Sequence, residues 1–200
     1  MKAFRIILAF LCCSMYSAAF AQTAKKKPIF HSQELLGLIN GKGAVSAVIQ
    51  SINGVEAGNW FAGVGVGIDF YRYRSVPLFA DVKRYFRIAN GNKLFIYGDC
   101  GYNFPWSKED NEQFSGWGGT TKVERDNKGG AYMDAGGGYA IQFSKGSALL
   151  LSLGFSHKFF SQKVMTTYQI GGEAGNTETT DIEQFNFNFN RLIIKIGWQF

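Results

Sequence analysis

Hydrophobic and polar positions alternate along much of this chain, most clearly in residues 60–71. An apolar set that includes Trp60, Val66 and Phe70 shares one parity, and the other parity carries glycines and Asp69. Successive side chains of a strand point to opposite faces of a sheet. This period of two therefore predicts a β-strand with one apolar face.

The same alternation recurs along the rest of the chain and predicts an all-β fold. Few segments show a helical period, and the composition, with 25 Gly, 16% aromatic and only 18% charged residues, suits strands and turns. With 60–71, the expected strands number eight, and we expect them to form a single antiparallel up-and-down barrel. The others cover residues 29–38, 44–52, 76–88, 93–104, 131–143, 148–160 and 192–200.

Two places depart from the simple pattern. Arg84 falls on an apolar face, where its long stem would let the charge reach an interface. The phenylalanines of 185–189 alternate with asparagine in the opposite phase to the terminal run 192–200. A β-bulge near Arg191, or an extension of the strand beyond a membrane, would account for this reversal.

The connections between the expected strands differ in length in a regular way. Two long segments, 105–129 and 163–183, fall at odd-numbered connections, so both should emerge at one end of the sheet, opposite the chain termini. Short turns at one end and long loops at the other are typical of outer-membrane barrels. We interpret the two segments as extracellular loops.

The amino-terminal segment has the three parts of a secretory signal. Lys2 and Arg5 precede a short apolar run, and Ala19-Phe20-Ala21 supplies a small-residue cleavage site. We expect residues 1–21 to be removed and residues 22–200 to form one exported domain.

The mature chain would keep Cys100 alone of the three cysteines, which excludes an intramolecular disulfide. Loss of the signal lowers the net charge of +6 by two. The remaining basic residues are scattered, and no nucleic-acid-binding motif is present, so we expect no nucleic-acid partner.

A closed sheet with one apolar face fits either a membrane or a ligand-binding barrel. In a soluble lipocalin-like barrel the apolar face would point inward, and the glycine-rich face of strands such as 60–71 and 131–143 would meet water. That face carries few of the Lys and Glu residues typical of a soluble surface. The pattern favours a membrane barrel with its apolar face towards lipid.

These features resemble a known group. Residues 191–200, ending in Phe200, and the glycine-alternating run 63–70 are similar to the small outer-membrane β-barrel proteins of the OmpA/OmpX type, particularly the short porin-like proteins common in Bacteroidetes. The resemblance implies a place in the outer membrane of a Gram-negative cell, among its lipids and lipopolysaccharide. It also implies that the barrel-assembly machinery recognises the apolar parity of the last strand: Leu192, Ile194, Ile196, Trp198 and Phe200.

Charged residues of both signs fall on the faces expected to point inward. Isolated charges in a confined interior are costly, so we expect a paired network that fills an eight-stranded lumen. A narrow proton or ion path is the alternative reading. The expected members are Asp69, Asp81, Lys83, Asp99, Asp134, Lys158, Arg191 and Lys195.

Catalysis and metal binding find little support in the sequence. Ser156 and His157 invite comparison with outer-membrane lipid A deacylases, but those enzymes carry the pair as H-x-S, and position 159 here is Phe. Adjacent residues of a strand face opposite ways and cannot act as nucleophile and base. Two histidines are too few for a metal site, and we expect no cofactor and no enzymatic activity.

Aromatic side chains in the first long segment are the candidates for binding a partner. Trp106, Phe114 and Trp117 lie among charged residues and glycines, and aromatic residues often anchor a partner. We expect a structural or adhesive role, with an unknown extracellular ligand. A small-solute channel is the second hypothesis, and a lipid-modifying enzyme is the third.

Overall fold

The structure is a computed structural model that describes residues 27–42, 44–88, 91–107, 109–116, 119–144, 146–172 and 175–200. The expected signal peptide, residues 1–21, lies outside the described residues, as does Trp117. The described residues form nine strands: β1 (Ile29–Gly41), β2 (Ala44–Ala57), β3 (Trp60–Asp69), β4 (Ser75–Arg87), β5 (Lys93–Pro105), β6 (Glu109–Gly116), β7 (Gly119–Ser144), β8 (Ser147–Gly172) and β9 (Gly175–Gln199).

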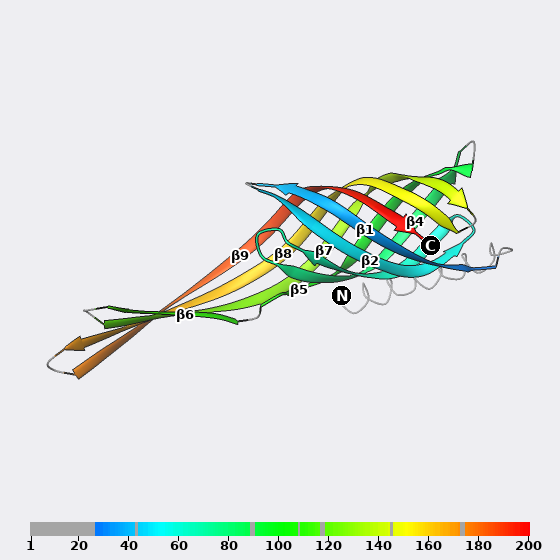
Figure 1. The fold of residues 1–200 in the computed structure, drawn as a ribbon. Helices are drawn as coiled ribbons and strands as arrows, with labels where there is room; N and C mark the ends of the chain where they lie inside the picture. The colour runs from blue at the N-terminus through cyan, green and yellow to red at the C-terminus, as the bar shows by residue number, and fades with distance from the viewer. Residues whose placement is uncertain are drawn as a thin grey trace, which may run out of the picture.

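Eight of these strands form a closed ring of antiparallel pairs. β1 to β5 pair in sequence order, β5 pairs with β7, β7 with β8 and β8 with β9, and β9 closes the ring on β1. Figure 1 shows the ring strands crossing at a tilt around a common axis. The prediction of an all-β antiparallel fold is confirmed, and the weakly patterned amino-terminal segments do form two strands, paired from Ile29↔Glu56 to Gly41↔Ala44.

The two segments interpreted as long loops are strands, and that part of the prediction is wrong. Residues 109–116 form β6 and residues 119–129 begin β7, while residues 163–172 end β8 and residues 175–183 begin β9. Residues 109–116 and 178–186 of these hairpins are exposed on both faces, and residues 119–126 and 163–167 are mostly half-buried on both faces. Alternating hydrophobicity marks a strand only when one face is buried and the other is not. These hairpins lack that difference between their faces, so their sequences do not show the alternation and were interpreted as loops.

The hairpins extend the sheet beyond the ring at the end opposite the carboxyl terminus (Figure 1). There β6, β7, β8 and β9 form an open four-stranded antiparallel sheet, with β6 at one edge and β9 at the other. Within it Arg125 lies 3.1 Å from Glu112, and this hydrogen-bonded partner raises the pKa of the guanidinium.

The reversed phase of residues 185–189 does not come from a bulge near Arg191, because Phe187 and Phe189 keep the inward parity of Arg191 and pack in the interior. The register of β8 against β9 is continuous from Ala148↔Gln199 to Gly172↔Gly175. Irregularities lie instead in β7, between Gly129 and Tyr132 and between Gln142 and Ser144.

No helix among the described residues is long and apolar enough to cross a membrane.

Candidate functional site

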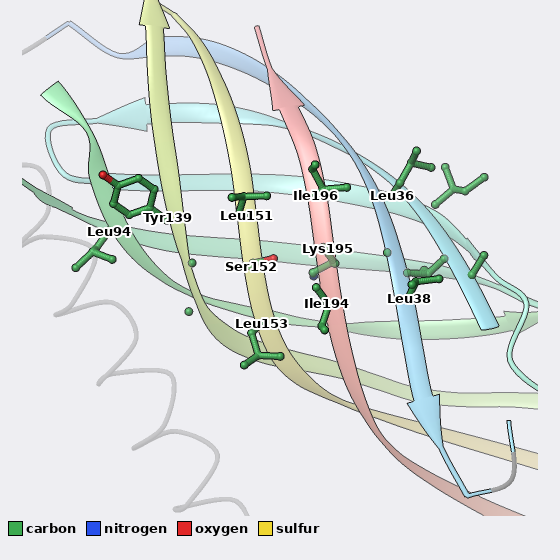
Figure 2. A pocket seen from close by; sticks show the side chains of 16 residues that line it. Leu36, Leu38, Leu94, Tyr139, Leu151, Ser152, Leu153, Ile194, Lys195 and Ile196 are labelled. Atoms are coloured by element: carbon green, nitrogen blue, oxygen red, sulfur yellow. The ribbon is translucent and has the colours of Figure 1, made fainter. Parts of the chain in front are cut away.

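The outer surface of the ring is apolar on every strand. Figure 2 shows one part of it, where Leu151, Leu153, Ile194 and Ile196 stand out from the neighbouring strands β8 and β9. Arg84, also on this face, lies 4.9 Å from the ring of Trp60. Exposed apolar residues from all eight ring strands include Leu36, Leu38, Ile49, Val64, Val66, Leu78, Val82, Leu94, Ile96, Met133, Leu151, Leu153, Phe155, Leu192, Ile194 and Ile196.

The interior, by contrast, holds the charged residues singled out from the sequence. All eight are buried, with at most 4% of their surface exposed. They come from β3, β4, β5, β7, β8 and β9, because the inward parity of each of these strands carries at least one of them. Four carboxylates face four cations, so the formal charges of this set balance.

One group of interior charges centres on Asp69, at the end of β3. Its Oδ2 lies 2.5 Å from Arg191 Nη1 and 2.9 Å from Lys158 Nζ. Its other oxygen accepts a 2.8 Å hydrogen bond from the backbone N–H of Tyr71. Arg191 also donates to Ser156 Oγ at 2.8 Å. A single carboxylate thus holds strands β8 and β9 and the start of the β3–β4 connection together.

A second group lies across β4, β5 and β7, where Asp81, Asp99 and Asp134 are direct cross-strand neighbours. Lys83 Nζ lies 2.6 Å from Asp81, and Lys195 Nζ lies 2.8 Å from Asp134 and 3.7 Å from Asp99. Like charges placed opposite one another destabilise a sheet unless cations lie between them. The two lysines supply that compensation.

Polar residues that sequence reasoning missed complete this second group. Tyr97 donates its hydroxyl to Asp134 at 3.0 Å, and Lys195 donates to Gln50 Oε1 at 3.3 Å. Gln50 in turn donates to the Tyr132 hydroxyl at 2.9 Å. All of these residues share the inward parity of their strands, which was the available signal, but uncharged residues do not stand out on that face.

Apolar side chains fill the rest of the lumen in two clusters. Between Lys83, Tyr97 and Lys195 a cavity of about 10 Å³ remains, about the space that one water needs. The first cluster contains Leu35, Ile52, Phe61, Phe79, Tyr85, Phe95, Tyr97, Tyr132, Ala140, Ala148 and Leu150. The second contains Ile39, Val48, Tyr71, Phe160, Phe189 and Ile193, with Tyr73 and Phe187 against it.

The second cluster is closed by the β3–β4 connection, residues 70–74, whereas the expected strands 60–71 and 76–88 implied only a short turn between them. Tyr73 stacks on Phe160 at 4.6 Å between ring centroids. Lys158 Nζ donates to the backbone carbonyls of Tyr71 and Tyr73 at 3.4 and 3.1 Å. Arg72, between those carbonyls, takes a left-handed backbone with φ of 54°. The connection therefore folds into the mouth of the ring opposite the termini.

The remaining sequence candidates lie apart from the charged interior. Leu192, Ile194, Ile196, Trp198 and Phe200 all lie on the outer face, where Trp198 stacks on Phe143 at 5.2 Å. Trp106 follows β5, and its backbone N–H bonds to the Arg74 carbonyl at 3.0 Å. Phe114 lies on β6 opposite Thr121. Trp106 and Phe114 thus occupy different elements and are both well exposed.

Ser156 and His157 point to opposite faces of β8. Ser156 is buried and bound by Arg191, whereas His157 Nδ1 lies 2.5 Å from Asn190 Oδ1 on the outer side. This arrangement does not join a nucleophile to a base. Within the described ranges, no three His, Cys, Asp or Glu residues are placed to hold a metal ion.

Comparison with known proteins adds one structural likeness. No protein-family model matches the sequence, and a search of curated proteins finds no match. Among solved structures, the N-terminal β-barrel domain of Pseudomonas aeruginosa OprF is similar, with a TM-score of 0.41 and 9% sequence identity, over 87% of this chain and 100% of that one.

Proposed function

We propose that this chain is an integral outer-membrane protein of a Gram-negative bacterium, an eight-stranded transmembrane barrel that presents two extended β-hairpins at the cell surface. The observation that carries the proposal is the reversal of the two faces of the ring. Apolar side chains cover the outside, while eight charged side chains are buried inside. In water this arrangement would expose a large apolar surface. In a bilayer the apolar side chains would contact lipid, and closure of the ring would pair the backbone groups of every strand.

The dimensions of the ring suit a bilayer. A tilted strand crosses the hydrocarbon layer with about 9–11 residues, and β3 has 10 residues. Closure of the ring leaves the backbone groups of its strands paired, as a lipid environment requires. The Trp198–Phe143 stack and the Arg84–Trp60 contact lie near turns and the carboxyl terminus, where amphipathic aromatics suit a headgroup layer.

The family resemblance of the carboxyl-terminal strand fits the same proposal. The apolar residues of the segment that resembles an assembly signal share the outward face: Leu192, Ile194, Ile196, Trp198 and Phe200. The assembly machinery could therefore bind them before the ring closes. Export by residues 1–21 and insertion by the barrel-assembly machinery would follow, with lipids and lipopolysaccharide around the finished barrel.

The role we propose is structural or adhesive, exerted through the surface hairpins. Their place opposite the carboxyl terminus would carry them outside the cell (Figure 1). The filled lumen argues against the alternatives of a small-solute channel and a lipocalin-like binder, because the interior cavity beside Lys195 measures only about 10 Å³. The separation of Ser156 from His157 argues against the lipid-modifying enzyme.

Localisation and heat-modifiability test the barrel together. The cell envelope is fractionated, and the protein is run on a detergent gel with and without boiling. We expect an outer-membrane band whose mobility changes on boiling, because a closed barrel resists detergent until heated. A soluble periplasmic protein with one mobility would overturn the proposal.

The surface role has its own test. A variant in which a short turn replaces residues 109–126 removes β6 and the part of β7 that pairs with it, while the β5–β7 pairs of the ring begin only at Asn103↔Gly130. Attachment of cells to surfaces and to one another is compared between this variant and the parent. If the variant and the parent are expressed at the same level and are both heat-modifiable, equal attachment of the two would rule out a role for that hairpin.

A further inference from the structure

One edge of β9 is left without a strand partner beyond the ring. β9 pairs with β8 from Gln199 to Gly175, but it pairs with β1 only from Gln199 to Leu192. β1 ends at Gly41, so the described structure has no strand beside residues 176–190 on that side. An unpaired edge is a template for another strand.

The hydrogen-bonding groups on this edge can be assigned from the ring. Phe200 and Ser32 exchange backbone hydrogen bonds of 2.9 and 3.3 Å, so even-numbered residues of β9 direct their N–H and C=O groups towards β1. The register shows no shift along β9, and these groups alternate along a strand. Asn186, Asn188 and Asn190 therefore direct their backbone N–H and C=O groups to the open side, where no partner occurs among the described residues.

A groove of about 360 Å³ lies along this edge. It is lined by five consecutive residues of β9, 186–190, together with Lys42, Tyr71 and Arg72. Alternate residues of a strand point to opposite faces, so five consecutive residues can share a groove only if it follows the strand edge. The groove continues the path that β1 leaves at Gly41.

Two cations also line the groove. Lys42 and Arg72 are exposed, no Asp or Glu lines the groove, and in the described part of the chain neither side chain has a recorded ion-pair partner. The backbone of Arg72 is held in its left-handed conformation by the two carbonyl hydrogen bonds of Lys158. The backbone that carries this positive charge is therefore anchored beside the groove.

The sequence of the edge does not protect it. Natural edge strands are commonly blunted by Pro, Lys or a bulge. Residues 184–190 alternate Asn or Gln with Phe and contain no charge, Pro or Gly. Such a segment is suited to pairing with an added strand.

We propose that the β9 edge at residues 186–190 binds, by strand addition, an extended peptide segment of a partner protein that carries acidic side chains. The backbone of the peptide would pair with Asn186, Asn188 and Asn190 in line with β1, and its carboxylates would meet Lys42 and Arg72. This inference goes beyond the proposed function. Peptide binding is measured on purified protein, so the test does not depend on the membrane in which the protein resides.

Binding is tested with defined peptides on the full mature chain, folded in detergent and shown to be heat-modifiable. The probe is a fluorescent peptide that alternates Glu with Val. Its controls are a peptide with Lys for each Glu and one N-methylated at alternate amides. We expect saturable binding of the acidic peptide, and binding at least about tenfold weaker for both controls. Equal binding of the N-methylated peptide, or no binding at all, would overturn strand addition.

Matched variants locate the site. Asn188→Pro removes one free edge N–H but no bond to β8, and proline is tolerated at an open edge. Asn188→Thr keeps the backbone N–H and removes only the side-chain carboxamide. Arg72→Asn removes the charge with a residue that accepts a left-handed backbone. We expect Asn188→Pro and Arg72→Asn to weaken binding at least about fivefold and Asn188→Thr to leave it unchanged.

Two further outcomes would reassign the groove. Displacement of the peptide by an acidic oligosaccharide, oligogalacturonate, with equal affinity in Asn188→Pro would make it a glycan site. A dimer of the parent protein that Asn188→Pro dissociates would make the occupant a second copy. Either result overturns the proposal of a peptide partner.

Discussion

Lys158 Nζ lies 2.9 Å from Asp69 Oδ2, and both side chains are almost fully buried inside the ring. The same ammonium group donates to Ser75 Oγ at 3.0 Å and to the carbonyls of Tyr71 and Tyr73. One lysine of β8 therefore binds both ends of the β3–β4 connection. This relationship links the charge balance of the lumen to the closure of its mouth.

Removing the shared carboxylate should destabilise the protein strongly. Asp69→Asn leaves Arg191 and Lys158 buried without their anion, and breaking a buried pair costs about 3–5 kcal/mol. The free energy of unfolding is measured by urea titration in lipid vesicles. Glu112→Gln is the matched control, because its pair with Arg125 is exposed and should be worth no more than about 1 kcal/mol. Equal losses in the two variants would contradict the structure.

Releasing Lys158 should open the mouth of the ring. Lys158→Met keeps a long side chain but loses the hydrogen bonds to the carbonyls of Tyr71 and Tyr73. We expect trypsin to cleave after Arg72 or Arg74 at least about tenfold faster, because cleavage tracks the population of the open form. Lys195→Met is the control, since Lys195 contacts the second charge group and not this connection. An unchanged rate in Lys158→Met would show that aromatic packing alone holds the connection.

Much of the ring was predictable because the outward face of each ring strand is apolar, whereas its inward face also carries polar or charged residues. The alternation in residues 60–71 and 148–160 predicts β3 and the first half of β8, although β3 ends at Asp69 and β8 continues to Gly172. The inward parity also identified Asp69 and Arg191, which come from β3 and β9 and lie 2.5 Å apart. Their pairing in space was not predictable, because it depends on how the ring closes.

The rest escaped prediction for identifiable physical reasons. β6 is exposed throughout, so it carries no periodic signal. Phe187 and Phe189 looked out of phase because the inner face changes from charged to aromatic beyond Arg191. The role of Tyr71 and Tyr73 depends on a connection that folds back inside the ring, and nothing in a short turn sequence indicates that direction.

Glycines of the ring should differ sharply according to what surrounds them. On β5, a Cβ added at Gly101 would meet the backbone of Leu78 and Phe79, whereas one added at Gly98 meets nothing within 4 Å. Gly101→Ala should cost about 1–3 kcal/mol through overpacking. Gly98→Ala should be neutral or slightly stabilising, because alanine loses less backbone entropy on folding. Urea titration in vesicles compares them, and equal effects would argue against the close approach of β4 to β5.

The filled lumen should not conduct. Aromatic clusters occupy both halves of the ring, and Lys83, Lys195 and Tyr97 surround a cavity of about 10 Å³. In planar bilayers we expect no sustained single-channel openings from heat-modifiable protein. Stable openings of uniform conductance would contradict the packing and revive the channel hypothesis.

The outer face distinguishes a lipid environment from water. Ile194 is 61% exposed in the middle of the apolar belt. In a bilayer, Ile194→Arg should destabilise the protein by about 2–4 kcal/mol, because arginine is costly at the bilayer midplane. If the same face met water, the change would be near neutral, since surface substitutions usually shift stability by less than about 0.5 kcal/mol.

Phe114→Arg provides the control for this comparison. Phe114 has the same exposure, 61%, but lies on β6 outside the ring, where the proposal puts water on both faces. Urea titrations in vesicles should show a loss for Ile194→Arg and almost none for Phe114→Arg. A neutral effect at both positions would contradict lipid contact at Ile194. A large loss at both would place the hairpin sheet, and not only the ring, against an apolar environment.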